Sequence, residues 1–381
     1  MKSQSAVILG AGIIGLNVAL ILAERGYASQ TTIIAEHLPG DTSINYTSPW
    51  AGANFSALSA SDKNALRWDK LGYKHLLNIA AKDGKQAFVQ ETSSIEYWDE
   101  MPSHTKLDSM ASYLKNVSRL PTVYPLPLPI QVPNIEILQF KEVPKQELPQ
   151  GVAFGITFTT ITINAPMHIQ YLLQKLTQHY GVRVVRKKVS DITSGFLNKD
   201  TKVVFNCTGN AARTLHGVRD PKCYPTRGQI LLARAPHIKQ NVMRHGKDYE
   251  TYVIPRPYSN GNVILGGYMQ KGVGIGDTIG EETKSILSRT KAMLAELDSS
   301  DTEILAAFAG LRPSREGGAR VASEVVQLDG FERNGIVVHN YGAGGTGFQA
   351  GYGMALDAVE IALVELQILQ SDSARIMKSS L

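Results

Sequence analysis

The chain has 381 residues, 43% of them hydrophobic and 19% charged, which is the composition of an ordinary globular protein long enough for two domains. Its net charge of +5 comes from dispersed Lys and Arg with no basic stripe, so we expect no nucleic-acid partner. Cys207 and Cys223 give neither a disulfide framework nor a metal-ligand spacing, which favours a reducing compartment and no metal site.

The beginning of the chain predicts a strand, a helix and a second strand. Residues 6–9 and 31–35 are apolar runs, each long enough for one buried strand. A helical pattern lies between them, from about residue 14 to 25, and Gly26 follows where a helix C-cap is expected. This order is typical of the β-α-β unit that opens a dinucleotide-binding domain.

Three glycines at the turn of this unit form the pattern G-x-G-x-x-G. Gly10 permits the tight turn, Gly12 lets a pyrophosphate approach the backbone, and Gly15 lets helix and strand pack closely. The phosphates would lie at the positive end of the helix. Glu36 ends the second strand, at the spacing where a carboxylate accepts hydrogen bonds from a ribose hydroxyl.

Two other interpretations of the same stretch are a signal peptide and a transmembrane helix. Met1 and Lys2 precede the apolar run, and residues 6–23 are nearly all apolar. The three glycines and Asn17 favour the strand, turn and helix instead, so we expect no membrane segment.

The rest of the chain predicts further strands and helices. We expect a loop at 37–58, an extended Pro-rich segment at 121–133, and helices at 62–83, 164–180, 281–297 and 349–369. Asn164 is the expected N-cap of the second of these. We expect strands at 86–98, 151–163, 182–189, 202–206, 251–254, 262–265, 304–309 and 335–339.

A strand, a glycine-rich turn and a helix thus recur near the end of the chain, after position 335. We therefore expect a discontinuous nucleotide-binding domain made of residues 1–58, 158–216 and 304–381. The inserted residues 59–157 and 217–303 would form the substrate-binding domain.

Seven local patterns, spread over nearly the whole chain, together resemble the D-amino-acid oxidase family of FAD-dependent flavoenzymes. They are VILGAGIIGL, TSPWAGAN, VVFNCTG, PTRGQI, YVIPRP with GNVILGG, GLRPSREGGARV, and HNYGAGGTGFQAGYG. The resemblance implies a mixed α/β (α+β) fold, with an FAD-binding Rossmann-like domain joined to a substrate domain on a mixed or antiparallel sheet.

The same resemblance implies that both ends of the chain hold FAD. The first glycines would approach its phosphates, Glu36 its ribose, Val189 its adenine through the backbone, and the turn at 344–347 its flavin ring. The expected contacts are Gly10, Ala11, Gly12, Ile13, Ile14, Gly15, Glu36, His37, Ser43, Ala51, Gly52, Asn54, Val189, Thr208, Gly209, Gly344, Gly345, Thr346, Gly347 and Gln349.

Two residues are expected to bind the carboxylate of an amino acid. Arg312, in GLRPSR just after a predicted strand, matches the arginine with which the family holds that carboxylate bidentately. Tyr252, in YVIPRP, matches the tyrosine that shares it. The alternatives are a structural salt bridge for the arginine and a packed strand aromatic for the tyrosine.

Three further positions would complete the substrate pocket. Met269 stands where relatives carry an aromatic or a basic residue, and Tyr268 beside it should point to the opposite face of the strand. The carbonyl of Gly345 would accept a hydrogen bond from the substrate amine. Gln349 would either face the pocket or be solvated at the start of its helix.

The activity implied is the oxidation of D-amino acids by dioxygen to 2-oxo acids, ammonia and hydrogen peroxide, through hydride transfer from Cα to flavin N5. Arg312 and Tyr252 would orient the substrate, and no strong general base is needed. Met269 occupies the place of a basic group that D-aspartate would need, which favours neutral side chains. The polar segment 241–251 could form a lid.

Other functions remain open from the sequence. Within enzymes they are a D-aspartate oxidase and a glycine or sarcosine oxidase, and outside them a catalytically inactive dinucleotide-binding scaffold. Ser379, Ser380 and Leu381 end the chain and resemble the tripeptide S-K-L that the peroxisomal import receptor reads. We therefore expect a peroxisomal location, with the cytoplasm as the alternative. A homodimer is expected from the family resemblance alone.

Overall fold

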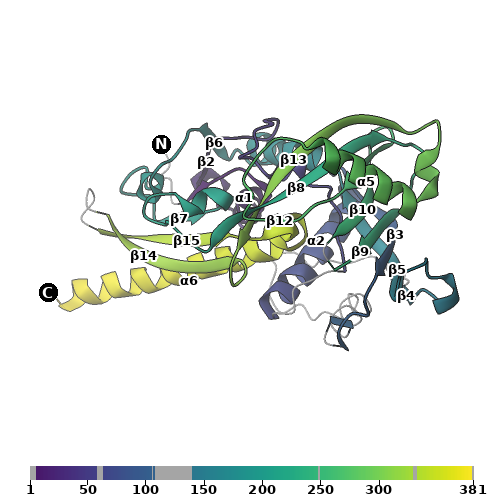
Figure 1. Cartoon of the computed structure of the whole chain (residues 1–381). Coiled ribbons are helices and arrows are strands. Elements are labelled where there is room, and N and C mark those ends of the chain that lie inside the picture. Colours follow the sequence, from purple (N-terminus) through teal and green to yellow (C-terminus); the bar gives the residue numbers. More distant parts are fainter. Residues whose placement is uncertain are drawn as a thin grey trace.

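The computed structural model describes residues 6–57, 63–104, 106–107, 140–247, 249–328 and 333–379. In this part of the chain, two β-sheets lie side by side with helices against them (Figure 1). The Pro-rich segment at 121–133 lies outside the described residues.

The first sheet has six strands in the order β14-β15-β7-β1-β2-β6. They are β1 (Ala6–Leu9), β2 (Thr31–Ala35), β6 (Arg183–Arg186), β7 (Val203–Asn206), β14 (Arg320–Leu328) and β15 (Arg333–Tyr341). All neighbours pair in parallel except β14 with β15. The short apolar runs form buried strands because both faces of this sheet are covered.

Alternate side chains of β1 pack into hydrophobic clusters on opposite faces of the sheet. Ile8 packs with α1 (Ile13–Glu24), α4 (Ala165–Gln174) and α6 (Gly347–Ser379), while Val7 and Leu9 pack against the other face. This alternation explains why the strand is apolar at every position.

The second sheet has nine strands, eight of them in the order β12-β8-β11-β10-β9-β3-β5-β4, with β13 paired to β8. Its strands are β3 (Val89–Trp98), β4 (Lys141–Glu142), β5 (Phe154–Ile163), β8 (Cys223–Arg234), β9 (Asn241–His245), β10 (Glu250–Pro255), β11 (Asn262–Gly266), β12 (Gln270–Lys271) and β13 (Glu303–Arg315). Pairing is antiparallel except between β3 and β9.

The two faces of this sheet carry different residues. Helix α5 (Gly280–Met293) covers one face over Leu231 and Val253. Ile230, Met243 and Tyr252 point to the other face. Helix α2 (Lys63–Ala87) packs along α6 and β3. The described short helical turns are Ala28–Gln30, Ser48–Trp50, Lys145–Glu147, Lys175–His179, Ile192–Gly195, Gly209–Arg213, Ala295–Asp298 and Gly344–Thr346.

The β-α-β start, the hairpin of β10 and β11, and the main helices confirm the expected elements. The strands β8, β9 and β14 were not predicted. The predicted lid at 241–251 is wrong, because its first half is β9, a buried strand between β10 and β3. Arg312 lies inside β13, which is longer than expected, and not after it.

Asn164 precedes α4, but its side chain does not cap that helix. The amide Nδ2 donates instead to the carbonyl of Pro257, 3.3 Å away. The expected domain boundaries at 158 and 304 both fall near or within strands of the second sheet, β5 and β13. We therefore propose that each domain is defined by its own sheet, so that β5 and β13 belong to the substrate-binding domain.

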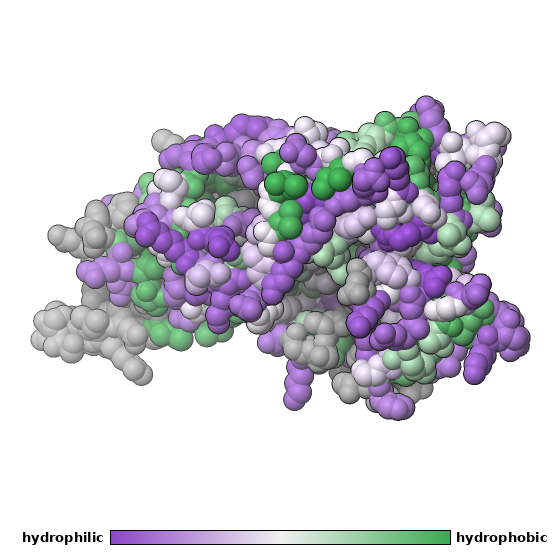
Figure 2. All heavy atoms as spheres, viewed as in Figure 1, coloured by the Kyte–Doolittle hydropathy of each residue, from purple (hydrophilic) through white to green (hydrophobic). Residues whose placement is uncertain are grey.

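Hydrophilic residues predominate on the face shown in Figure 2, and hydrophobic ones form small separate groups there. No helix in the described ranges is both long and apolar enough to cross a membrane.

Candidate functional site

A cavity of about 930 Å³ opens between the two sheets. It begins at the turn after β1, passes the loop around Ser48, and ends beside β10 and β13. Its volume lies near the upper end of the roughly 300–1,000 Å³ that small-molecule sites occupy. The cavity can therefore hold an elongated ligand that contacts both sheets.

The glycine turn after β1 is shaped by close backbone contacts. Gly10 has φ +106°, and a Cβ there would lie 2.5 Å from the carbonyl oxygen of Cys207. A Cβ on Gly15 would lie 2.0 Å from the carbonyl oxygen of Gly10. Gly12 is the N-cap of α1 and has no side chain to cover the turn, and it lines the cavity together with Ile13 and Ile14, so the N-terminus of this helix lies at the cavity wall.

Almost all the expected cofactor contacts line this cavity. The exceptions are Gly15 and Ser43. Gly15 packs the helix against the strand, as its Cβ contact indicates, and does not line the cavity. Ser43 bonds within its own loop: its hydroxyl accepts from the amide of Asn45 at 3.2 Å, and its carbonyl accepts from the Trp50 indole at 3.1 Å.

Ser48 takes the place that was expected for Ser43. Its hydroxyl accepts a hydrogen bond from the amide of Ile13 at 3.0 Å, at the first turn of α1. A Cβ on Gly12 would lie 3.0 Å from the same oxygen. At the far side of the turn, Glu36 pairs with Lys188 of the segment after β6, with 3.0 Å between Oε1 and Nζ.

The cavity wall fits the expected FAD. Three of its residues carry buried polar atoms that have no hydrogen-bond partner in the described part of the chain: His37 Nε2, Asn210 Oδ1, and both amide atoms of Asn340. Buried polar groups are nearly always paired, so these atoms are suited to a polar ligand. The open glycine turn of α1 adds room and positive charge for phosphates.

Arg312 points into the other end of the cavity. Its Nη1 donates to the carbonyl of Tyr268 at 2.9 Å, and its Nη2 lies 3.5 Å from the hydroxyl of Tyr252. It forms no ion pair with any carboxylate that the structure describes, whereas Arg315, on the same strand, is paired with Asp220 at 2.8 Å. Arg312 thus keeps donors for an anionic ligand.

Tyr252 is almost buried beside this guanidinium, with 9% of its surface exposed. Burial raises the pKa of its hydroxyl, which the positive charge of Arg312 partly offsets. A Cβ on Gly266 or Gly267 would lie within 2.4 Å of the ring or its hydroxyl. These two glycines therefore allow the ring to lie flat across the end of β11.

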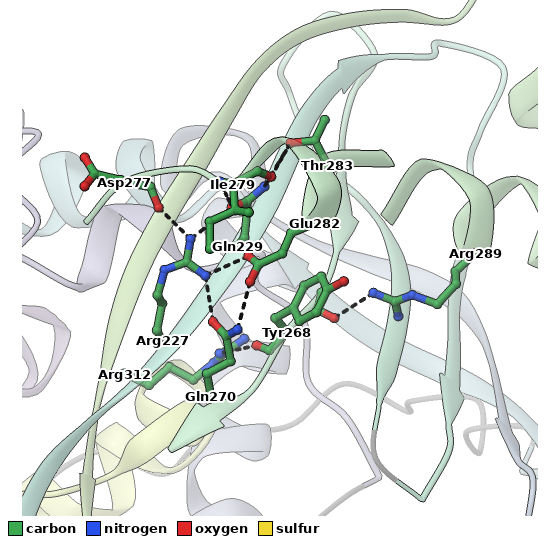
Figure 3. A network of polar contacts seen from close by, with 11 residues as sticks. Arg227, Gln229, Tyr268, Gln270, Asp277, Ile279, Glu282, Thr283, Arg289 and Arg312 are labelled. Atoms are coloured by element: carbon green, nitrogen blue, oxygen red, sulfur yellow. Dashed lines mark hydrogen bonds and ion pairs between the residues drawn. The ribbon is translucent and has the colours of Figure 1, made fainter. Parts of the chain in front are cut away.

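Met269 and Tyr268 point in different directions, as expected, although both lie in the segment between β11 and β12 and not in a strand. Met269 lines the cavity and is 60% exposed. Tyr268 packs on the side of α5, where the guanidinium of Arg289 lies 5.2 Å from its ring centre. Arg289 Nη2 also donates to the carbonyl of Gly267 at 3.0 Å, so α5 holds the segment that contacts Arg312 (Figure 3).

A buried polar network continues this support behind the sheet (Figure 3). Arg227 has no exposed surface and pairs with Glu282 of α5 at 2.7 Å. Gln270, next to Met269, bonds to both of these residues, at 2.7 and 2.8 Å. The network ties β8, β12 and α5 together on the face away from the cavity.

Gly345 and Gln349 reach the cavity in different ways. Gly345 lies beside Arg312, where an added Cβ would be 3.6 Å from Cδ of the arginine. Gln349 is 5% exposed, so it is not solvated at the start of its helix. Its Oε1 accepts from the amide of Ser56 and its Nε2 donates to Asp69, both within 3.1 Å. This amide joins three segments rather than presenting free polar atoms.

Two further wall residues, Met243 and Glu250, were not predicted. Met243 lies on β9 and is beside Tyr252 only because β9 pairs with β10, whereas Glu250 lies at the start of β10 itself. Alternation along β10 could have suggested Glu250, which is two residues from Tyr252. Among the described residues, no group of three or more side chains could hold a metal ion.

Comparison with known proteins gives three findings. The family model of FAD dependent oxidoreductases (DAO) matches residues 5–361. The D-amino-acid oxidase of Schizosaccharomyces pombe is 41% identical over 372 residues, which cover 96% of this chain and 98% of that protein. The D-aspartate oxidase of Cryptococcus neoformans var. grubii is 27% identical, over 94% and 97% of the two chains.

Among solved structures, the glycine oxidase of Bacillus cereus superposes with a TM-score of 0.70. The alignment covers 95% of this chain and 96% of that one at 15% identity. At this level of identity the likeness shows the shared fold, which is mixed α/β as expected.

Proposed function

The chain belongs to the DAO family of FAD-dependent oxidoreductases, and on this basis we propose that it deaminates D-amino acids with neutral side chains by oxidation. The supporting observation is Arg312: a guanidinium without a carboxylate partner among the described residues, at the far end of a cavity that starts at a nucleotide-type glycine turn. Such a site suits a small anion placed against the reactive part of a dinucleotide.

The wall residues would hold FAD along the length of the cavity. Gly10, Gly12 and the N-terminus of α1 would accept its phosphates, Glu36 its ribose, and the turn at 344–347 its ring. When bound, FAD supplies the two-electron acceptor that amino-acid side chains lack, and dioxygen restores it.

The chain's own side chains would orient the substrate. Arg312 donates two parallel hydrogen bonds to the carboxylate, and the Tyr252 hydroxyl donates a third. Gly345 offers its carbonyl to the amine, which must be uncharged when the Cα–H bond breaks. With carboxylate and amine fixed, exchanging hydrogen and side chain would turn that hydrogen away from the acceptor. The site therefore selects one enantiomer by position.

The preference for neutral side chains rests on which cations line the cavity. The described lysines and arginines of its wall are Arg312, Lys187 and Lys188. The two lysines belong to the ribose end, where Lys188 pairs with Glu36. No second cation of the described wall stands near Met269 to bind the side-chain carboxylate of D-aspartate.

Anaerobic mixing of the purified holoenzyme with candidate substrates tests this function. The protein should be yellow, and D-alanine should bleach its flavin absorbance while L-alanine leaves it unchanged. Faster bleaching by D-aspartate, glycine or sarcosine would move the assignment to a D-aspartate or a glycine or sarcosine oxidase. A yellow protein that none of them bleaches would be an inactive dinucleotide-binding scaffold.

Replacing Arg312 separates substrate binding from cofactor binding. Arg312→Ala should retain FAD and lose turnover with D-alanine. Arg234→Ala is the matched control, because Arg234 forms a surface ion pair with Glu303 on the same sheet. Normal turnover by Arg312→Ala would contradict the carboxylate assignment.

We also propose a peroxisomal location, because the C-terminal tripeptide resembles S-K-L and the reaction makes peroxide. Ser380 and Leu381 lie outside the described residues. Microscopy of a fluorescent fusion with and without the last three residues tests the location. Light scattering tests the homodimer that the family resemblance suggests.

A further inference from the structure

Glu250 extends the substrate end of the cavity wall. It lies two residues from Tyr252 on β10, so both side chains point to the same face of the sheet. On the neighbouring strand β9, Met243 pairs with Tyr252 and His245 pairs with Glu250. The wall therefore continues from Tyr252 and Met243 to Glu250, which lines the same cavity.

Among the described residues, the ring of His245 is the side chain that holds the carboxylate of Glu250 in place. Its Oε2 lies 2.5 Å from Nδ1 of His245, and Nε2 of that ring lies 3.2 Å from the buried Glu96. Glu96 is fixed in turn by the hydroxyl of Ser56 at 3.1 Å. The second oxygen of Glu250, Oε1, accepts no hydrogen bond from a described residue, and Glu250 lines the cavity.

Two described basic side chains, His245 and Lys106, interact electrostatically with Glu250. Burial lowers the pKa of His245, but the hydrogen bonds that its ring donates to the carboxylates of Glu250 and Glu96 outweigh this effect and raise that pKa to about 9, so the imidazole is a cation at neutral pH. Lys106 also faces both carboxylates: burial lowers its pKa, and they raise it. Arg289 Nη1 donates to the main-chain carbonyl of Glu250 at 2.9 Å.

Glu250 and Arg312 act on the same small space. Both charges influence the Tyr252 hydroxyl, where burial raises the pKa most, Arg312 lowers it and Glu250 raises it. A substrate whose carboxylate contacts Arg312 and Tyr252 thus has Glu250 close by, one step further along the sheet.

We propose that Glu250 is a specificity residue that selects D-amino acids whose side chains end in a hydrogen-bond donor, such as an ammonium, a guanidinium or an amide. This inference rests on the proposed oxidation of D-amino acids and changes the expected side-chain class, from neutral side chains in general to those that end in a donor, cationic ones included. An ionised carboxylate offers only acceptors. A donor at the end of the substrate side chain can donate a hydrogen bond to Oε1 of Glu250. An apolar end displaces the water that solvates Oε1 and offers no hydrogen bond in its place. A carboxylate end places two negative charges close together.

Binding of simple carboxylates to the holoenzyme tests the proposal without turnover. The probes are butanoate, pentanoate and hexanoate, the same chains with a terminal amine, and the dicarboxylates of the same lengths. Perturbation of the bound flavin spectrum, or calorimetry, gives each affinity. At the best length the amine should bind roughly tenfold tighter than the plain chain and the dicarboxylate at least tenfold weaker, as hydrogen bonds to charged groups lead us to expect. Equal affinities within each length would overturn the proposal.

Glu250→Gln changes the charge and keeps the shape. In this variant the amine-bearing chain and the dicarboxylate should each bind about as tightly as the plain chain of the same length. Glu303→Gln, at an exposed ion pair of the same sheet, is the matched control and should keep the wild-type ratios. A wild-type ratio in Glu250→Gln would refute the role of this residue. If the variant does not fold, the probe series on the wild type still decides the question.

Turnover gives a second readout that compares two substrates within one protein. The ratio of kcat/KM for D-lysine to that for D-norleucine should exceed one in the wild type and fall roughly tenfold in Glu250→Gln. If no D-amino acid reduces the flavin, the proposed function fails while the affinities still test Glu250. If D-norleucine is oxidised as well as D-lysine, the function stands and the specificity proposal fails.

Discussion

A methyl group at position 228 should displace the guanidinium of Arg312 without unfolding the protein. Gly228 lies on β8, under the arginine, and an added Cβ would be 2.3 Å from Nη1 and 2.8 Å from Cζ. Ordinary contacts begin near 3.4 Å. The guanidinium must therefore move by about 1 Å, and a displacement of that size can cost roughly a hundredfold in rate. Because only the end of a flexible side chain has to move, the loss of stability should be small.

Steady-state kinetics with D-alanine measures this effect. Gly228→Ala should lose about a hundredfold in kcat/KM, with FAD content and melting temperature close to the wild type. Gly280→Ala is the matched control, since a Cβ there meets nothing within 4 Å. Unchanged kcat/KM in Gly228→Ala would refute the position of Arg312 or its role in binding the carboxylate.

Three other predictions follow from single positions. Gly15→Ala should prevent α1 from packing, because its Cβ would lie 2.0 Å from a backbone oxygen; the soluble yield and FAD content of the variant measure this. Tyr252→Phe should raise KM for D-alanine about tenfold and keep FAD, since it removes a donor to the carboxylate. His245, whose pKa is raised from 6.5 to about 9, should contribute at most about 3 kcal/mol of stability. That contribution is complete below pH 6.5 and lost as pH rises through 9, so the difference in melting temperature between wild type and His245→Asn should shrink above pH 9.

Local patterns predicted the parts of the fold that depend on neighbouring residues. The apolar run of β1, the glycine turn and the helix after it are set by steric and hydrogen-bond requirements within about thirty residues. The strands β8 and β9 were missed because they carry buried polar residues. Arg227 lies in β8, and its partner Glu282 comes from a distant helix. In β9 the buried polar residue that interrupts the apolar pattern is Asn241, whose amide donates to the hydroxyl of Ser94 of β3.

In the candidate site, too, some residues could be predicted from local patterns and others could not. Arg312, Tyr252 and the glycines stand in patterns that a sequence displays, and all but Gly15 line the cavity. Ser48 has its role only through a contact with Ile13, 35 residues away, and Glu250 through a contact with His245 on the neighbouring strand. Ser43 and Ser48 are both serines of the same polar loop, so the sequence does not distinguish them. The backbone path of the loop decides which hydroxyl accepts the hydrogen bond from the first turn of α1.

Arg312 has one more consequence, for handling the protein. Its guanidinium forms no ion pair with a carboxylate in the described part of the chain, so solvent anions compete for it whenever substrate is absent. Acetate or chloride in a buffer would then compete with the substrate, and inhibition would increase with the anion concentration. The bound anion would also raise the melting temperature, because it binds the folded state only. Activities measured in different salts are comparable only after extrapolation to zero competing ion.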